Sequence, residues 1–298
     1  MQLYQNTIQD ELLIEGEGLH TGQSCRLAIR PAPVNTGILF HKQAGDAEIQ
    51  IPAIATNVVS TSFATTLGLD DSPEMSISTV EHLMAAIQGL GIDNLYCYVS
   101  GPEIPMLDGC SQRFVECLGE IGILAQDEFK KVLRIKETVC CADGDAWAIL
   151  KPHDSFRLNV QIDYEHSSFQ DPMVCHASFD NAEHSFIDEI SQARTFGFRR
   201  DYLDLLEAGY AQGIKEKSSA VLIYEKHCLA EGAELRYPNE AARHKILDAL
   251  GDLALTGFGS ILGSYTGYKA GHTLNNRLAR KLLAQPHCFE ETYLADLN

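Results

Sequence analysis

Two successive stretches of this chain show the same order of predicted elements, with strand-like segments followed by helical ones. In the first stretch, alternation or β-branched residues predict strands at 25–30, 49–54, 61–67 and 94–100. Apolar residues at helical spacing predict helices at 79–88 and 114–121. The second stretch gives strands at 132–140, 147–151, 156–164, 220–224 and 260–265, and helices at 202–207, 240–255 and 271–283. Strands followed by helices, twice over, favour an α+β fold built from two similar layers.

Polar residues interrupt the pattern between the two stretches, at 126–131. We therefore divide the chain into an N-terminal α+β domain, residues 1–127, and a C-terminal α+β domain, residues 128–298. A length of 298 residues suits two domains of ordinary size, which can bury a sizeable core without disulfides or metals.

The charge of the chain argues against one class of partner. Asp and Glu number 41 against 23 Lys and Arg, so the net charge is -18. A surface this acidic repels phosphate backbones, and we expect no nucleic-acid binding. An anionic small substrate is not excluded, because one buried Lys or Arg can govern a pocket whatever the global charge.

The N-terminal residues and the cysteines indicate a cytoplasmic protein. Residues 1–6 contain no basic region followed by an apolar run, so no signal peptide is expected. No segment approaches the ~20 apolar residues that span a bilayer, so membrane contact would be at most peripheral. The nine cysteines are odd in number and lack C-x-x-C spacing, which favours reduced thiols. No obligate protein partner is evident.

The helix expected after Asn239, a plausible N-cap, carries two stripes of side chains. One stripe is apolar and would be buried. The other holds His244, Asp248 and Asp252 at positions i, i+4 and i+8. His244 and Asp248 can therefore reach one point, and imidazole and carboxylate are both good zinc ligands. On spacing alone, an ion pair on a solvated face is the simpler interpretation.

A second cluster lies at the start of the helix predicted at 79–88. Ser78 and Glu81 fit the S-x-x-E capping box, which explains the glutamate structurally. Yet Glu81 and His82 are adjacent in the first turn, where one could bind a metal while the other faces the water on that metal. Taken alone, the residues favour the cap. A capping role would also lower the pKa of Glu81 and make it a poorer base.

Two further segments hold candidate functional residues. Gly271 and His272 lie at a loop-to-helix junction, where functional groups are often presented, although a lone histidine there is more often polar surface. The segment 194–198 is predicted to be a compact loop. Within it, Thr195 could donate a hydrogen bond to an oxyanion.

In this order, these clusters resemble the UDP-3-O-acyl-N-acetylglucosamine deacetylases, the zinc enzymes that commit a precursor to lipid A. Further matching segments are Gly18–Gly22, Arg30–Gly37, Gly91–Asn94, Pro102–Gly109 and Arg134–Glu137. The likeness extends from about residue 10 to about residue 283. So many separate segments in one order make a specific signal.

The resemblance implies a fold and a set of functional residues. The fold is two α+β domains that sandwich their helices between two β-sheets, with the site at the domain junction. The metal ligands are His82, His244 and Asp248, which would hold Zn²⁺, although Fe²⁺ suits the same donors. The catalytic residues are Glu81 as general base, His272 as protonated electrostatic and acid group, Thr195 as oxyanion contact and Asp252 to orient His272. The substrate contacts are Lys245 at the phosphates, Phe196 on the sugar and His20.

The resemblance also implies the reaction. The expected substrate is UDP-3-O-acyl-N-acetylglucosamine, and hydrolysis of its N-acetyl group would release acetate. Three protein ligands leave a fourth zinc position open, as catalytic sites require. Under this resemblance the capping-box and ion-pair interpretations become minor ones.

One segment departs from the family pattern. Family members carry a Gly-Gly-Ser-like turn where this chain has residues 213–219, with two lysines and a glutamate. This segment follows the C-terminal insert expected to build the acyl-chain passage, so the departure bears on the preferred acyl length. Two alternatives stay open: a non-catalytic sugar-nucleotide-binding paralogue, and a zinc hydrolase of another acylated amine.

Overall fold

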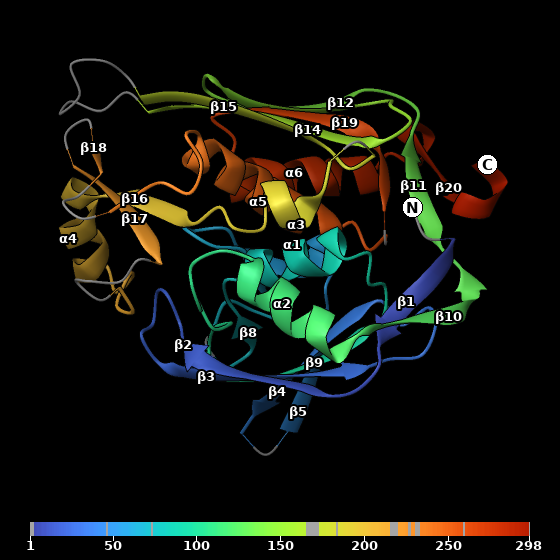
Figure 1. Cartoon of the computed structure of the whole chain (residues 1–298), viewed down its shortest axis with the longest axis horizontal. Coiled ribbons are helices and arrows are strands. Elements are labelled where there is room, and N and C mark those ends of the chain that lie inside the picture. Colours follow the sequence, from blue (N-terminus) through green and yellow to red (C-terminus); the bar gives the residue numbers. More distant parts are fainter. Residues whose placement is uncertain are drawn as a thin grey trace.

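The computed structural model describes residues 3–297 except 46, 73, 165–172, 183, 215–219, 226–227, 230–232 and 259. Helices α1 (Glu81–Gly89), α5 (Glu240–Ala254) and α6 (His272–Leu283) lie between two β-sheets, one formed by the first half of the chain and one by the second, as Figure 1 shows. The predicted α+β fold with helices sandwiched between two sheets is therefore confirmed. The division at residues 127 and 128 stays a prediction.

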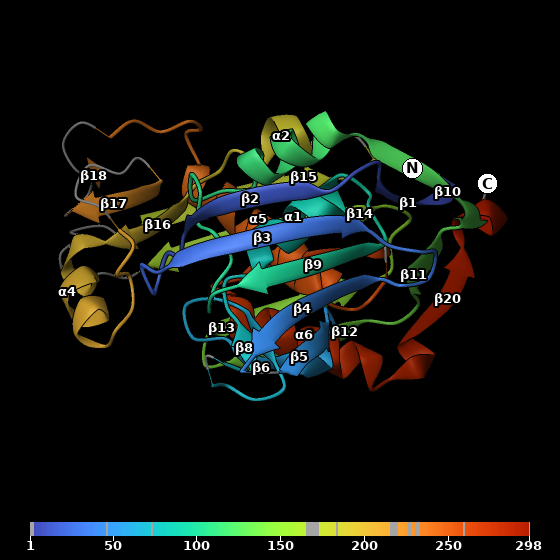
Figure 2. The same cartoon turned by 90° about the horizontal axis from the view of Figure 1, so that it is seen from below.

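The lower sheet in Figure 1 has five strands in the order β2-β3-β9-β4-β5. Their bounds are β2 Leu12–Glu17, β3 Ser24–Pro31, β9 Leu95–Ser100, β4 Ile38–Ala44 and β5 Ala47–Pro52. Strand β4 pairs parallel with β9, and the other pairs are antiparallel. The alternation in β3 turns Leu27 and Ile29 into the core, where both are fully buried. Figure 2 shows the opposite face of this sheet, which no helix covers.

The upper sheet has seven strands from the second half of the chain. Five follow the order β12-β13-β19-β11-β20, and β14 pairs with both β19 and β15. Their bounds are β11 Lys131–Ile135, β12 Val139–Asp143, β13 Ala146–Lys151, β14 Phe156–Tyr164, β15 Met173–Asp180, β19 Ile261–Tyr268 and β20 Phe289–Tyr293. Leu158 and Val160 alternate along β14 and pack inward. The two sheets thus offer facing apolar surfaces to the helices between them.

Helices α1 and α5 pack against each other in the middle of the sandwich. Helix α1 spans Glu81–Gly89 and α5 spans Glu240–Ala254; the others are α2 Gln112–Ile121, α3 Phe186–Glu189 and α6 His272–Leu283. The two central helices approach closely at Gly251, where a Cβ atom would lie only 2.1 Å from the carbonyl oxygen of Glu81. A glycine at this position therefore lets the first turn of α1 rest on α5.

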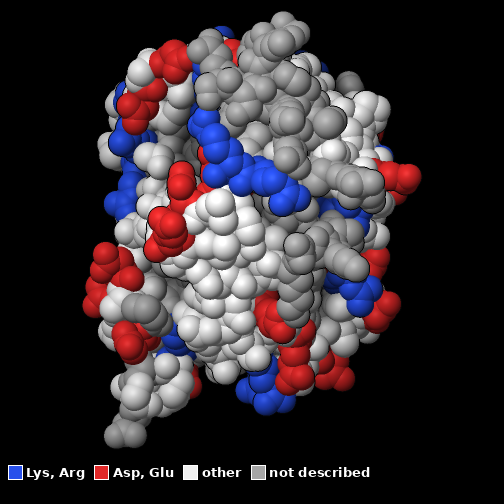
Figure 3. Space-filling view, turned by 90° about the vertical axis from the view of Figure 1, so that its left-hand side faces the viewer, with Lys and Arg blue, Asp and Glu red and all other residues white. Residues whose placement is uncertain are grey.

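Smaller elements complete the fold. They are the pair β1 Tyr4–Ile8 and β10 Ile123–Phe129, the sheet of β6 Val58–Ser60, β7 Thr66–Gly68 and β8 Ser76–Ile77, and the 3₁₀ helices η1 Ala55–Asn57, η2 Pro286–Cys288 and η3 Leu294–Leu297. An insert of β16 Thr195–Phe198, α4 Arg199–Glu207, β17 Val221–Glu225 and β18 Cys228–Leu229 projects at the end opposite the termini (Figure 1). On this end of the molecule, charged side chains surround an area without charge (Figure 3).

Several predicted elements need correction. Residues 61–65 lie between β6 and β7 and are not strand, and the expected strand 132–140 is two strands separated at 136–138. The polar stretch 126–131 is not a loop, because β10 continues to Phe129 and β11 begins at Lys131. Strand β10 tolerates polar residues because, among the described strands, it pairs with β1 alone and none of its side chains is buried.

Two properties bear on the environment of the chain. The eight cysteines whose side chains are described are all free thiols. Among the described helices, none combines the length and the apolar character that crossing a membrane requires.

Candidate functional site

The facing turns of α1 and α5 bring His82, His244 and Asp248 together. All three are buried, at 4%, 2% and 2% exposure. Asp248 Oδ1 lies 3.3 Å from His244 Nε2 and 3.7 Å from His82 Nε2. One donor atom from each residue lies within 4.8 Å of the others. His82 and His244 are 162 positions apart in the sequence, yet they surround one point because α1 rests directly on α5.

This trio fits a divalent cation. Asp248 Oδ1 is buried and has no hydrogen-bond partner among the described residues. Such an orphaned carboxylate oxygen is costly unless a cation or donor meets it. His244 Nδ1 lies 2.9 Å from the carbonyl oxygen of Ala193, which can only accept, so Nδ1 carries the proton and Nε2 presents a lone pair. The donor set of two imidazoles and a carboxylate is that of catalytic zinc sites.

The protonation states of these ligands also suit a metal. Burial lowers the pKa of His82 to about 3 and also lowers that of His244. Burial alone would raise the pKa of Asp248, but the charges of the Lys245 ammonium and the His272 imidazolium hold it well below its usual range. Both imidazoles are therefore neutral and the carboxylate is ionised at pH 7, as metal coordination requires.

Glu81 and His272 form an acid–base pair beside the trio. His272 Nε2 lies 3.8 Å from Glu81 Oε1, and Glu81 Oε2 accepts a hydrogen bond of 3.0 Å from the backbone N–H of Thr65. Burial raises the pKa of Glu81 to about 7, against the opposing charge of His272. Burial alone would lower the pKa of His272, but the charges of Asp252 and Glu81 raise it to about 9. Near pH 8 the pair is a carboxylate beside an imidazolium.

Asp252 holds the ring of His272 from the other side. His272 Nδ1 donates to Asp252 Oδ2 at 2.9 Å, and Asn275 Nδ2 donates to the same oxygen at 2.8 Å. Thr65 Oγ1 donates to Asp252 Oδ1 at 2.5 Å, and Tyr265 OH donates to Asn275 Oδ1 at 2.6 Å. Sequence reasoning missed Thr65 and Asn275, which only the fold brings to Asp252, and Tyr265, which reaches Asp252 only through Asn275.

The structural alternatives for these residues are wrong. Helix α1 begins at Glu81, so Glu81 cannot occupy the third position of a capping box begun at Ser78, whose hydroxyl instead accepts from Thr66 at 3.0 Å. His244 and Asp248 face the interior, not a solvated surface. Asn239 is the N-cap of α5 by position, but its side chain makes no capping hydrogen bond.

Lys245 and Phe196 border the trio. Lys245 Nζ donates to Asp248 Oδ2 at 2.7 Å and lies 5.7 Å from the centroid of the Phe196 ring. That ring lies 6.3 Å from the ring of His244. The expected phosphate contact, Lys245, is thus already paired with an expected metal ligand.

The segment of Thr195 is strand β16, not the predicted loop. Before it, the buried Arg194 binds both carboxylate oxygens of Glu240, at 2.8 and 3.2 Å, and so ties the strand to the start of α5. The backbone N–H of Thr195 donates to Gly109 at 2.8 Å, while its hydroxyl bonds to no described residue.

His20 lies on a loop held by the fully buried Glu103. The Glu103 carboxylate accepts from the backbone N–H groups of His20 and Thr21, each at 3.0 Å, and from the hydroxyls of Thr21 (2.9 Å) and Thr79 (2.7 Å). Neither ring nitrogen of His20 has a hydrogen-bond partner among the described residues. The ring packs 5.5 Å from that of Tyr210 and 6.5 Å from that of Phe63.

Glu103 links this loop to Thr79, just before α1, and sequence reasoning did not single it out. Thr79, its hydroxyl donor, has φ 59, an unfavourable value for a β-branched residue, two positions before Glu81. Glu103 belongs to the Pro102–Gly109 segment, which carries part of the family resemblance. A single carboxylate between two prolines matches no spacing that is typical of a functional motif, so the sequence alone does not single it out.

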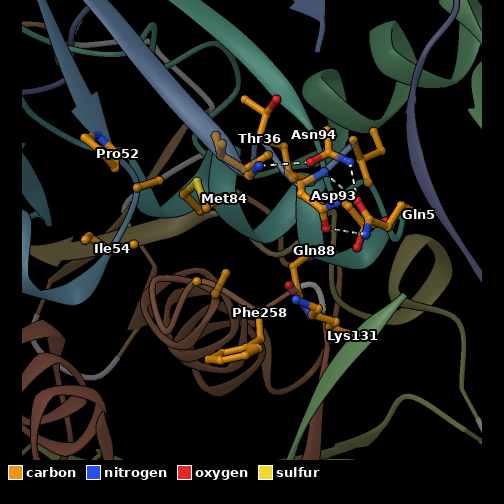
Figure 4. A pocket seen from close by; sticks show the side chains of 18 of the residues that line it. Gln5, Thr36, Pro52, Ile54, Met84, Gln88, Asp93, Asn94, Lys131 and Phe258 are labelled. Carbon is orange, nitrogen blue, oxygen red and sulfur yellow. Dashed lines mark hydrogen bonds between the residues drawn. The ribbon is translucent and has the colours of Figure 1, made fainter. Parts of the chain in front are cut away.

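A separate hollow of about 320 Å³ lies between the two halves of the chain, on the side of α1 that bears Met84 and Gln88 (Figure 4). Its buried polar groups are satisfied within the protein: Asn94 donates to Gln5 Oε1 at 2.9 Å and accepts from Gly37 at 2.9 Å. None of the predicted site residues lines it. The hollow is therefore separate from the candidate site at His82, His244 and Asp248.

Comparisons with known proteins agree with this geometry. Residues 5–284 match the family described as UDP-3-O-acyl N-acetylglycosamine deacetylase. Three similar proteins are named UDP-3-O-acyl-N-acetylglucosamine deacetylase. They come from Thioalkalivibrio sulfidiphilus (42% identity, covering 99% of this chain and 94% of the relative), Idiomarina loihiensis (44%, covering 96% and 92%) and Shewanella oneidensis (43%, covering 97% and 92%).

Proposed function

The chain belongs to the UDP-3-O-acyl N-acetylglycosamine deacetylase family, and from this premise we propose how its own residues carry out the reaction. It is an amide hydrolase that removes the acetyl group of UDP-3-O-acyl-N-acetylglucosamine in lipid A biosynthesis. The main support for the proposed metal site is the buried Asp248 Oδ1, which faces two neutral imidazoles and has no hydrogen-bond partner among the described residues.

His82, His244 and Asp248 are the proposed ligands of the metal on which the family depends. When bound, the ion supplies Lewis-acid polarisation of the acetyl carbonyl and a water acidified to a pKa of roughly 7. We assign Zn²⁺ because two imidazoles and a carboxylate are common zinc ligands, while Fe²⁺ remains compatible with the same donors.

Glu81 acts as general base. Its raised pKa, about 7, makes the carboxylate strong enough to take a proton from the attacking water near neutral pH. The hydrogen bond from the backbone of Thr65 fixes Oε2, which leaves Oε1 on the side of His272. The carboxylate therefore enters the reaction already oriented, and little ordering is needed at the moment of proton transfer.

His272 acts as the cation of the site. Because Asp252 holds its Nδ1 proton, Nε2 is free to donate to the oxygen that gains negative charge or to the departing amine. Thr195 is proposed as a further donor to that oxygen, since its hydroxyl bonds to no described residue. One such donor is worth about 3 kcal/mol in the transition state. Asp252 positions His272 and stabilises its charged form.

Lys245, Phe196 and His20 are the proposed substrate contacts. An ammonium group has three donors, so Lys245 can keep its bond to Asp248 and still bind a phosphate oxygen. Phe196 offers an aromatic face beside His244 for the sugar, and His20 offers two uncommitted ring nitrogens. The uncharged area at the end that bears the insert (Figure 3) suits an acyl chain. Of the segment 213–219, which differs from the family pattern, only residues 213–214 are described; residues 215–219 lie outside the described part of the chain.

We keep the division into residues 1–127 and 128–298 as part of the proposal. Glu81 and His82 come from the first part, and His244, Asp248, Asp252 and His272 from the second. A reaction centre built at such a junction would require both parts to be docked. The two alternatives, a non-catalytic paralogue and a hydrolase of another acylated amine, lose ground to the family assignment.

Acetate release tests this assignment of residues. Purified protein should release acetate from UDP-3-O-acyl-N-acetylglucosamine, should lose this activity on chelation, and should regain it with Zn²⁺. His82→Ala and Asp248→Ala should each abolish stoichiometric zinc binding as well as turnover. A Lys269→Ala variant, which alters an exposed Lys269–Asp145 ion pair, is the matched control. Metal retention and turnover in both ligand variants would remove the proposed site.

A further inference from the structure

A second group of metal-ligating side chains lies away from the site described above. Glu137, His287 and Cys288 each offer one donor atom, and the three atoms lie within 4.8 Å of one another. Glu137 lies between β11 and β12, and the other two residues form the end of η2, just before β20. We propose that these side chains form a second metal site, for a borderline-soft divalent cation such as Zn²⁺.

The backbone around this second site is already fixed by hydrogen bonds. The carbonyl oxygen of Cys288 accepts from the N–H groups of Lys136 (2.8 Å) and Glu137 (3.2 Å). The N–H of Cys288 in turn donates to Gln285 at 2.8 Å, and Pro286 fixes φ at the start of η2. The two ligand-bearing segments are thus joined before any ion binds, so ion binding requires little further ordering of the backbone.

The three donor groups have almost no competing partners. No described residue makes a hydrogen bond or ion pair with the carboxylate of Glu137 or with the ring of His287. Cys288 Sγ has only a long contact of 3.6 Å to Gln285 Oε1. The thiol is 3% exposed, whereas Glu137 and His287 are exposed. An ion could therefore enter from solvent through the outer two ligands and reach the sulfur beneath them.

The chemistry of the donors selects the class of ion. Thiolate, imidazole and carboxylate together match Zn²⁺, while Mg²⁺ and Ca²⁺ prefer oxygen ligands alone. Thiolate and carboxylate balance the charge of a divalent ion, and binding would release the thiol proton. With three protein ligands, solvent would complete a tetrahedron. The sulfur also distinguishes this site from the catalytic trio, which has none.

A bound ion would act on structure, not on the deacetylation itself. Strand β20 pairs antiparallel with β11 along residues 131–135 and 289–293, and the proposed ligands flank the end of this pairing at Ile135 and Phe289. The ion would hold η2 and β20 against the sheet, and so stabilise the folded chain by an amount that grows with the logarithm of the free metal concentration above the dissociation constant. This inference is independent of the proposed catalytic residues.

Cobalt substitution separates the two sites, because only a sulfur ligand gives a near-ultraviolet sulfur-to-cobalt charge-transfer band. Metal-free full-length protein is titrated with Co²⁺ and followed by absorption and by metal analysis after gel filtration. Cys140→Ser is the matched control, since Cys140 is an exposed thiol outside the group. Circular dichroism of each metal-free variant checks that the fold is kept.

The wild-type protein and Cys140→Ser should show the charge-transfer band and bind one cobalt ion more than Cys288→Ser. The visible bands of the catalytic ion should be the same in all three proteins. His287→Ala changes an exposed side chain, so the variant should fold normally. Its affinity for cobalt, measured from the charge-transfer band, should fall at least ten-fold. Absence of the band in the wild type, or a band that survives in Cys288→Ser and His287→Ala, would overturn the proposal.

Discussion

Replacing Asp252 by asparagine should move the basic limb of the pH–rate profile to lower pH. The buried Asp252 carboxylate accepts the Nδ1 proton of His272 at 2.9 Å, and its charge is a main reason why the pKa of His272 is raised to about 9. Asparagine has similar size and can still accept a hydrogen bond, but it carries no charge. The variant therefore isolates the electrostatic part of the contact.

The size of the displacement follows from the charge separation. Two unit charges about 4 Å apart interact by about 4 kcal/mol at an effective dielectric constant of about 20. At 1.36 kcal/mol for each pH unit, this lowers the pKa of His272 by ~3, to roughly 6. That value falls below the pKa of Glu81, about 7. The form with Glu81 ionised and His272 protonated then becomes a minority at every pH, so the optimal rate falls roughly ten-fold from protonation alone.

The assay is kcat/KM against pH for wild type and variant, at equal metal content. In the wild type the rate should rise as Glu81 loses its proton and fall as His272 loses its own. Thr65→Val is the control, because it removes a hydrogen bond to Asp252 while keeping the charge, and its basic limb should not move to lower pH. An Asp252→Asn protein that retains metal and the wild-type basic limb would refute the assignment of that limb to His272.

Three further changes test other parts of the site. Glu81→Gln should keep the metal and lower kcat roughly 10²–10⁴-fold, and near-normal turnover would exclude Glu81 as the base. Gly251→Ala places a Cβ atom 2.1 Å from the carbonyl oxygen of Glu81, so α1 must shift from α5, and an unchanged urea midpoint and rate would contradict the packing argument. Glu103→Gln sets an amide donor against the N–H groups of His20 and Thr21, which costs about 3 kcal/mol. It should raise KM more than it lowers kcat, and a uniform loss of active protein with unchanged KM would mean a purely structural role.

The periodic parts of the fold were predictable from the sequence because buried faces repeat at the period of the element. Strand β14 matches its predicted range, and α5 ends within one residue of it. The predictions for residues 126–131 and 194–198 were wrong because partners distant in sequence decide the structure of these segments. Strand β10 depends on β1, and β16 depends on β17 and on the buried Arg194–Glu240 pair.

The site residues themselves could be found only as separate clusters. The spacing of His244 and Asp248 places them on one face of a helix, but a surface ion pair has the same spacing. What excludes the ion pair is burial, which arises because the glycine at 251 admits α1. Residues that act through a single hydrogen bond, such as Thr65 and Asn275, have no pattern of their own, and only the folded chain brings them to Asp252.

Anomalous diffraction at the zinc edge, from crystals of protein loaded with one equivalent of Zn²⁺, measures where the catalytic ion lies. We expect one peak within bonding distance of Nε2 of His82, Nε2 of His244 and Oδ1 of Asp248, the three atoms that converge in the structure. Glu81 and His272 should flank the ion without binding it. A zinc-loaded, active protein with no peak among these three side chains would contradict the central claim.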